Sequence, residues 1–321
     1  MSAIRVLLIT QGVSRLVSPL FGTRHQVVGV LESMSRGYEG SKKRSLLIDI
    51  LKDLYWFVTG RKSVSLRDFC KGKNVPYNFI WKGNAKEIAG WVAELKPELI
   101  VVFSMSQLLK DDILRIPSRG VINLHPSYLP DYRGPNPDFW QYYDMEMYPG
   151  VTVHYVDAGE DTGDIIYQER MHIPLGTKSP ARLDKLIGEL GVPLVLKTID
   201  AIAQNNAPRT PQSVQGSTPR ARNLIPEEHS QIIDWEHWPI ERVWHVLRGT
   251  ELWLNAISPP TGLMAGQRWT IQEYEKTEAP SGIPGKVGKY KNRQCVFASG
   301  GVIYIYIDFD IKKLILKILQ K

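Results

Sequence analysis

Short apolar runs recur through roughly the first two hundred residues of the chain, with longer polar or helix-like stretches between them. The runs occupy residues 4–10, 27–33, 98–104, 121–124 and 151–156. Runs of this length are typical of buried strands, and strands that alternate with helices favour a mostly parallel sheet covered on both faces. We therefore predict a Rossmann-like, doubly wound α/β domain that spans residues 1–203.

Two helices of this domain are expected from their apolar spacing. After Asn84, apolar residues recur at the i, i+3, i+4 and i+7 positions of one helix face, and the Lys96-Pro97 pair ends the helix. Asn84 is expected to cap this helix, with Glu87 three residues further along. A second, mixed helical segment at residues 45–58 is expected to bury its leucine-rich side against the sheet.

The remainder of the chain has a different character. Residues 204–226 are rich in Pro, Ser, Thr, Gln and Arg without a hydrophobic period, which predicts a linker or an extended strap. A helix is expected between Pro239 and Gly249, because proline favours helix starts and glycine favours helix ends. Residues 227–321 are then predicted to form a small OB-like β-barrel. Its strand-like runs occupy residues 268–275, 285–290, 293–299 and 301–309.

Charge and cysteine content narrow the class of protein. The net charge of +7 and the pI near 9.2 fit an anionic partner, such as a nucleotide, a folate or RNA. The two cysteines, Cys70 and Cys295, lie far apart, so neither a disulfide framework nor a bound metal is expected. The apolar run at residues 4–10 is too short for a signal peptide or a membrane span, so we expect a cytoplasmic protein with no membrane partner.

Chemically active residue types gather where the fourth apolar run ends, in the stretch "VINLHPSYLPDYRG" (residues 121–134). Asn123 and His125 are two residues apart, so their side chains point to the same face of an extended strand. Pro126 and Pro130 follow and restrict the backbone. The sequence therefore predicts a fixed amide and imidazole pair at the end of a strand, where open α/β sheets place ligands.

A second polar element follows the fifth apolar run. The segment "DAGEDTGD" (residues 157–164) contains four acidic residues and two glycines, which is typical of a site loop and not of a buried core. We single out Asp161, because the segment after it returns as a strand and directs this carboxylate toward Asn123 and His125. His154, inside the preceding run, is interpreted as a packed core residue.

The sequence lacks the glycine-rich motifs that bind dinucleotides or the phosphates of nucleotides. No Gly-x-Gly-x-x-Gly follows the first apolar run, where "ITQGVSRLVSP" stands instead, and no Gly-Lys-Ser or Gly-Lys-Thr phosphate loop occurs. Dinucleotide binding and phosphate-loop chemistry therefore have no support.

Taken together, the motifs resemble those of the formyltransferases that use 10-formyltetrahydrofolate. The shared pattern is Asn-x-His-Pro-Ser-x-Leu-Pro-x-x-Arg-Gly from Asn123, Gly-Val-Thr-x-His from Gly150, and Asp-x-Gly-x-Asp-Thr-Gly-Asp-Ile from Asp157. The separation of 38 residues between Asn123 and Asp161 also agrees with the family's Asn, His, Asp triad. The resemblance is dense over residues 97–170. It continues faintly into segments similar to the small barrel of methionyl-tRNA formyltransferases and of some sugar-modifying relatives.

The resemblance implies a role for each residue of the triad. Asn123 is expected to donate a hydrogen bond to the formyl oxygen as it gains negative charge, His125 to accept the proton of the attacking amine, and Asp161 to orient the imidazole. The formyl donor, 10-formyltetrahydrofolate, is expected to be held mainly by main-chain groups of two loops. The residues assigned to it are Phe103, Ser104, Met105, Ser106, Leu108, Leu109, Asp157, Gly159, Glu160 and Asp164.

Three acceptor hypotheses follow. The first is a nucleotide-linked amino sugar, because the aromatic and acidic segment at residues 135–148 suits a stacked base and sugar hydroxyls. The second is methionyl-tRNA, favoured by chain length, charge and barrel, although the family's Gly-Thr-Pro-x-Phe turn is missing after the first run. The third is a catalytically inactive RNA-binding protein, against which the intact triad argues. The residues assigned to the acceptor are Ser127, Arg133, Trp140, Tyr142 and Tyr143. The alternative role for each of the three aromatic residues is to pack beneath the loop without contacting the acceptor.

Overall fold

The computed structural model describes residues 2–34, 64–81, 84–213, 215–278 and 282–310, so the helical segment expected at residues 45–58 lies outside it. The chain divides into two compact units. The first unit comprises residues 1–133, 150–170 and 186–218, and the second comprises 134–149, 171–185 and 219–321. In this division the segments 134–149 and 171–185, which precede residue 203, fall in the second unit. None of the described helices is long and apolar enough to cross a membrane.

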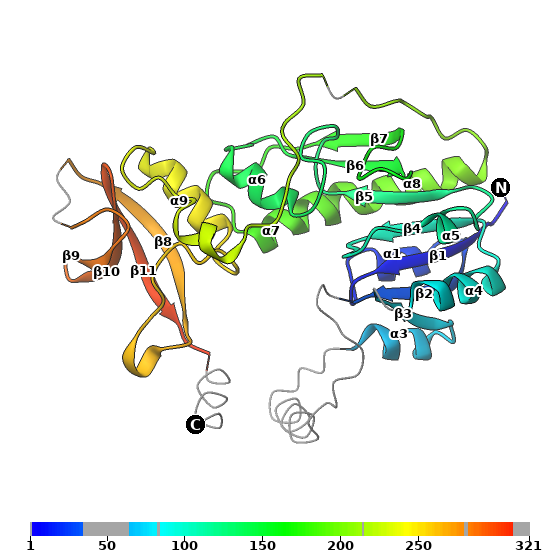
Figure 1. Cartoon of the computed structure of the whole chain (residues 1–321), viewed down its shortest axis with the longest axis horizontal. Helices are drawn as coiled ribbons and strands as arrows, with labels where there is room; N and C mark the ends of the chain where they lie inside the picture. Colours follow the sequence, from blue (N-terminus) through cyan, green and yellow to red (C-terminus); the bar gives the residue numbers. More distant parts are fainter. Residues whose placement is uncertain (1, 35–63, 82–83, 214, 279–281, 311–321) are drawn as a thin grey trace. The chain divides into compact units, whose positions relative to one another are not determined.

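The first unit contains a seven-stranded sheet in the order β3-β2-β1-β4-β5-β6-β7 (Figure 1). The strands from β3 to β5 pair in parallel, whereas β5 with β6 and β6 with β7 pair antiparallel. The strands are β1 (Arg5–Thr10), β2 (Gln26–Ser33), β3 (Tyr77–Ile80), β4 (Leu99–Phe103), β5 (Val121–His125), β6 (Gly150–Tyr155) and β7 (Ile165–Arg170). The helices are α1 (Val17–Phe21), α3 (Leu66–Gly72), α4 (Ala85–Leu95), α5 (Asp111–Leu114) and α8 (Val192–Ala203), the last entered through the π-helical segment η1 (Asp184–Gly191).

Both faces of this sheet are buried, which explains why its central strands are apolar throughout. In β1, Leu7 and Ile9 pack in the cluster that also contains residues of α4 and α5. Val6 and Leu8 alternate with them and are equally inaccessible to solvent, so they face the opposite side. The mostly parallel, doubly wound architecture predicted from the sequence is confirmed.

Helix α4 matches its predicted span but not its predicted cap. Asn84 makes no side-chain cap hydrogen bond; its side chain instead accepts from the Trp81 amide and donates to the Phe79 carbonyl. Those partners lie before the helix, so Asn84 fixes the preceding turn. At the other end, Lys96 adopts a left-handed conformation with φ of 46°, a common way for a helix to end.

Strand register determines which side chains meet on the sheet. β5 lies between β4 and β6, with Val102 beside Asn123 in the parallel pair. In the antiparallel pair, Asn123 lies directly opposite His154. Strand β6 runs antiparallel to β5, and Tyr155 at the end of β6 is the register partner of Ile122 near the start of β5. The loop at residues 157–164, which we call the acidic loop, therefore leaves the sheet beside Ile122. This loop therefore has to turn back along β5 to bring Asp161 near the strand's polar residues.

The segment expected to be a linker contributes a further pairing to the first unit. Thr210 forms an isolated antiparallel bridge with Ile165 at the start of β7, through two backbone hydrogen bonds of 2.9 Å. Beside this bridge, the guanidinium of Arg209 lies 3.7 Å from the centroid of the Tyr155 ring. We call residues 208–213 the strap.

The second unit is built on a four-stranded antiparallel sheet in the order β8-β11-β10-β9. Its apolar face packs on α9 (Ile240–Gly249), the helix predicted between Pro239 and Gly249. A small OB-like barrel was expected, and the described strands form an antiparallel sheet with β8 and β9 at its edges. The strands are β8 (Arg268–Lys276), β9 (Val287–Tyr290), β10 (Arg293–Ala298) and β11 (Gly301–Asp308). The other helical elements are α6 (Pro137–Tyr143), α7 (Ser179–Leu183), η2 (Pro226–Ser230) and η3 (Gly262–Met264).

Candidate active site

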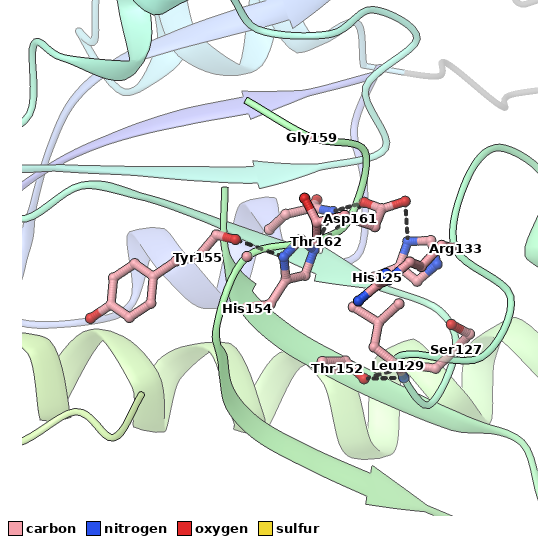
Figure 2. A network of polar contacts seen from close by, with 12 residues as sticks. His125, Ser127, Leu129, Arg133, Thr152, His154, Tyr155, Gly159, Asp161 and Thr162 are labelled. Carbon is pink, nitrogen blue, oxygen red and sulfur yellow. Dashed lines mark hydrogen bonds and ion pairs between the residues drawn. The ribbon is translucent and has the colours of Figure 1, made fainter. Parts of the chain in front are cut away.

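Asn123, His125 and Asp161 lie together in the first unit. The carboxylate of Asp161 contacts both β5 side chains: its Oδ1 is 3.4 Å from Asn123 Nδ2, and its Oδ2 is 3.5 Å from His125 Nδ1. Figure 2 shows His125 and Asp161 facing one another over the sheet. Asp161 therefore joins the three residues that the sequence singled out, because it lies within 3.5 Å of each of the other two.

The segment that follows β5 holds the imidazole of His125 in one orientation. Its Nε2 lies 3.0 Å from the carbonyl oxygen of Tyr132, so this nitrogen carries the proton and donates it to the carbonyl. In the neutral ring Nδ1 is then unprotonated and faces Asp161. Burial lowers the pKa of His125, and the negative charge of Asp161 partly offsets this effect. The imidazole is thus neutral near pH 7, with its basic atom directed at a carboxylate.

His154 was expected to be a packed core residue, but its ring also contacts two residues of the site. Its side chain is 2% exposed, yet Nε2 is 3.2 Å from Asn123 Nδ2 and 3.6 Å from Asp161 Oδ1. Nδ1 donates to the Tyr155 carbonyl at 2.8 Å, so Nε2 accepts a hydrogen bond from the Asn123 amide. Only the antiparallel register of β6 against β5 places His154 opposite Asn123, and the sequence pattern did not indicate that register.

The acidic loop is shaped by its own side chains and glycines. The Asp157 carboxylate accepts hydrogen bonds from the Gly159 amide and from the Thr162 hydroxyl. At Gly163, a Cβ atom would collide with the Tyr155 carbonyl oxygen, so the close return of the loop to β6 requires glycine. Asp161 itself adopts a left-handed conformation with φ of 54°, which aspartate tolerates better than most residues.

The second loop expected to hold the formyl donor follows β4, next to Asn123. Phe103 ends the strand, Ser104 adopts a left-handed φ of 63°, and the Ser106 amide donates to the Ser33 hydroxyl. Met105 and Leu109 pack against the core, whereas Leu108 is 69% exposed. Residues 104–109 have irregular backbone and belong to no strand, so this loop is where peptide groups are expected to meet the polar edges of a pterin ring.

The side chains assigned to the acceptor are more dispersed. In the first unit, Ser127 is fully buried and its hydroxyl donates to the Asp131 carbonyl, so it supports the turn and does not face a ligand. Arg133 donates to Gln212 Oε1 from Nε and Nη2, at 3.1 and 2.6 Å. Its guanidinium is therefore partnered within its own unit.

The three aromatic residues assigned to the acceptor belong to α6 of the second unit. Tyr142 is 0% exposed and donates its hydroxyl hydrogen to the Thr177 carbonyl, so the expectation that it lines an approach to the site is not met. Trp140 and Tyr143 are half-buried against the core of that unit. Trp140 also donates its indole N–H to the Arg222 carbonyl. Packing, the alternative role of these aromatics, accounts for the side chain of Tyr142.

The arrangement combines a neutral base, a carboxylate beside that base, and an amide donor. Among the described residues no group of three His, Cys, Asp or Glu side chains is placed to hold a metal ion. Such a set is suited to moving one proton and stabilising one developing negative charge, the two demands of transferring a carbonyl group to an amine.

Sequence comparison places the chain among known proteins. A model of the formyl transferase family matches residues 78–199. Methionyl-tRNA formyltransferase of Moorella thermoacetica is 37% identical over 195 residues, which cover 61% of this chain and 59% of that protein. Methionyl-tRNA formyltransferase of Alkaliphilus oremlandii is 34% identical over 218 residues, covering 68% of this chain and 67% of that protein. The match thus spans less than two thirds of the length of the Moorella protein.

Solved structures share the fold at low sequence identity. WlaRD, a sugar 3N-formyltransferase solved with dTDP and 5-N-formyl-THF, aligns with a TM-score of 0.59 and 16% identity, covering 97% of this chain and 100% of that one. HypX from Aquifex aeolicus in complex with tetrahydrofolic acid aligns with a TM-score of 0.57 and 17% identity, covering 95% and 44%. These likenesses support the fold of both units.

Proposed function

Because the chain belongs to the formyltransferase family, with 34% identity to the Alkaliphilus protein over 67% of that protein's length, we propose that it transfers a formyl group from 10-formyltetrahydrofolate to a primary amine. The observation that carries this proposal is the contact of 3.5 Å between His125 Nδ1 and Asp161, with His125 Nε2 fixed by the Tyr132 carbonyl. This arrangement leaves His125 Nδ1 as the basic atom of the ring, next to the Asp161 carboxylate.

The geometry assigns the proton transfer to His125 Nδ1. As the amine nitrogen bonds to the formyl carbon, its proton passes to Nδ1, and the imidazolium that forms lies against the Asp161 carboxylate. The bond from the formyl carbon to N10 of the folate then breaks, and the departing N10 takes up the proton, which returns the imidazole to its neutral form. In a serine protease triad the carboxylate contacts the opposite ring nitrogen from the one that moves the proton. Here the Tyr132 carbonyl has that orienting role, and Asp161 stabilises the charge of the protonated ring.

Asn123 is suited to stabilise the oxygen of the tetrahedral intermediate. Its amide donates to His154 at 3.2 Å and more weakly to Asp161 at 3.4 Å. An anionic formyl oxygen competes well for the longer of these hydrogen bonds, while His154 keeps the amide oriented. One such preorganised donor typically contributes about 3 kcal/mol to transition-state stabilisation.

The names of the curated relatives favour methionyl-tRNA as the acceptor over the amino sugar expected first from the sequence. Both proteins compared above are methionyl-tRNA formyltransferases, at 37% and 34% identity. Methionyl-tRNA is therefore the leading acceptor in our proposal. Family membership and the assembled triad leave little support for the third hypothesis, an inactive RNA-binding protein.

A nucleotide-linked amino sugar remains the second candidate, favoured by the distribution of charge. Residues 227–321 hold twelve Lys and Arg residues against eleven Asp and Glu residues, so nearly all of the excess of +7 comes from earlier residues. Three of these cations are already paired with carboxylates, Lys276 with Glu241, Lys291 with Glu275 and Arg293 with Glu273. A surface that follows a phosphate backbone needs a surplus of positive charge, which this part of the chain lacks.

A panel of acceptors separates these candidates. Wild-type protein and the His125→Gln variant are incubated with 10-formyltetrahydrofolate and either methionyl-tRNA or nucleotide-linked amino sugars, and products are followed by mass. We expect one formyl group to be gained on a primary amine with wild type and almost none with the variant. If no amine in the panel is formylated, or if the variant matches wild type, the proposed function is wrong.

A further inference from the structure

The strap approaches the catalytic residues through one side chain, Gln212. The Gln212 amide nitrogen donates to two carbonyl oxygens of the acidic loop, that of Asp161 at 3.0 Å and that of Gly163 at 2.6 Å. The Gln212 amide oxygen accepts two hydrogen bonds from the guanidinium of Arg133. Both hydrogens and both lone pairs of this amide are therefore used. These four hydrogen bonds also fix the orientation of the amide, because a flipped amide would direct its N–H groups at the Arg133 guanidinium.

The two segments joined by Gln212 carry the two partners of His125. One segment bears Asp161, whose carboxylate faces His125 Nδ1. The other is the turn in which Arg133 follows Tyr132, the residue whose carbonyl accepts from His125 Nε2. The Tyr132 amide is itself fixed, since it donates to the Thr218 hydroxyl further along the chain. The environment of both imidazole nitrogens thus depends on residues after the last helix of the first unit.

Asp161 needs such external support. Its left-handed backbone, with φ of 54°, is sparsely populated by residues other than glycine and persists where surrounding contacts hold it. Within the loop, the carboxylate of Asp157 supports Gly159 and Thr162. The hydrogen bonds from Gln212 hold the carbonyls at Asp161 and at Gly163, the side of the loop that returns to β7.

We infer that Gln212 is a positioning residue for formyl transfer: it clamps the acidic loop to the Arg133 turn and so sets the distance between Asp161 and His125. Its expected effect on rate rests on the proposed function, whereas its effect on the ionisation of His125 does not. A displacement of about 1 Å in a catalytic group is enough to lower a rate by as much as 10²-fold. The anchoring of the strap at Thr210 keeps Gln212 in place from its own side.

The test compares Gln212→Met, which keeps the length of the side chain but loses every polar contact, with Gln215→Met as the matched control. Gln215 lies three residues further along and is exposed. With the acceptor found in the panel above, we expect kcat to fall roughly 10- to 100-fold in Gln212→Met and to stay at the wild-type value in the control. Thermal unfolding of both variants shows whether they are folded.

A second variant separates the two halves of the clamp. Gln212→Glu retains an acceptor for Arg133 but has no N–H for the Asp161 and Gly163 carbonyls. We expect kcat to fall in this variant as well, because the loop is released. Wild-type kcat in Gln212→Glu overturns the inference, since Arg133 alone would then account for any loss seen with methionine.

Titration of His125 by NMR needs no acceptor and no turnover. His125 faces Asp161 and His154, with the charge of Glu160 also acting on it, and Asp161 is the strongest of these influences. We expect the pKa of His125 to be lower in Gln212→Met than in wild type, because the carboxylate moves away. An unchanged pKa overturns the clamp even if the enzyme is inactive, whereas a lower pKa together with an inactive wild-type protein contradicts only the proposed function.

Discussion

At the scale of single residues, the roles depend on which atom of each side chain is engaged. The Nε2–H of His125 is committed to the Tyr132 carbonyl, so only Nδ1 is available as a base. The Nδ1–H of His154 is committed to the Tyr155 carbonyl, so its Nε2 accepts from Asn123. Two backbone carbonyls therefore fix two imidazole tautomers, and the tautomers in turn direct the proposed base and the amide donor.

Removing either β5 side chain should abolish most turnover. We expect His125→Ala to lower kcat by about 10²–10⁴-fold and Asn123→Ala by a similar factor, with nearly unchanged affinity for the folate. Both side chains act on charges that develop only in the transition state. Steady-state kinetics and folate titration measure the two effects. His237→Ala, at an exposed histidine of the second unit, is the control, and a His125→Ala enzyme within a few-fold of wild type contradicts the assignment.

The pH dependence should report the ionisation of His125. Because burial lowers the pKa of His125, its basic form persists below pH 6.5, and kcat/KM should fall only as the pH drops through that lowered value. The charge of Asp161 raises this pKa, so Asp161→Asn should move the acid limb to lower pH while also reducing the plateau rate. Glu160→Gln should move the limb in the same direction by less. An acid limb that moves to higher pH in Asp161→Asn would show that Asp161 does not act on His125.

At the scale of elements, the decisive feature is the return of the acidic loop to the sheet. β6 delivers this loop beside the start of β5, and the loop has to fold back within a few residues to place Asp161 over Asn123. The Tyr155 amide donates to the Asp164 carbonyl, which closes the base of the loop. Gly163 makes this closure sterically possible.

A methyl group at Gly163 should therefore reduce activity more than stability. In Gly163→Ala the new Cβ meets the Tyr155 carbonyl, so the loop shifts and Asp161 leaves His125; we expect at least about a tenfold lower kcat. The matched control is Gly90→Ala in the middle of α4, where nothing lies within 4 Å of the added atom. That variant should keep full activity and gain roughly 0.5–1 kcal/mol in the free energy of unfolding, measured by denaturant titration. Full activity in Gly163→Ala would contradict a fixed loop.

At the scale of the whole molecule, the proposed catalytic residues and the bulk of the positive charge lie in the first part of the chain. The triad, both loops expected to hold the donor, and the strap all belong to the first unit. The second unit adds a four-stranded sheet and a tryptophan-rich core, and within it residues 227–321 carry almost no net charge. The distribution of charge along the chain, as well as the shape of the site, therefore bears on which acceptor is formylated.

Binding of tRNA should depend only moderately on salt. A protein that neutralises six to ten phosphates loses about 10³–10⁵ in affinity between 50 and 200 mM salt. With residues 227–321 near electrical neutrality, we expect a loss clearly smaller than this in filter-binding titrations. A loss within the full range would show that a phosphate backbone is followed closely after all, and would strengthen methionyl-tRNA against the amino sugar.

The sequence by itself determined the elements and the chemistry. Apolar runs predicted β1, β2, β4, β5 and β6 of the first unit but not β3, and Asn123, His125 and Asp161 stood out because their residue types and spacing suit formyl transfer. What depended on contacts between distant residues remained open: the antiparallel register that brings in His154, the packing of Tyr142, the strand order of the C-terminal sheet, and the hydrogen bonds of Gln212. Local spacing determines which way a side chain points along its own strand. Which partner lies opposite is decided only when strands pair and the chain closes on itself.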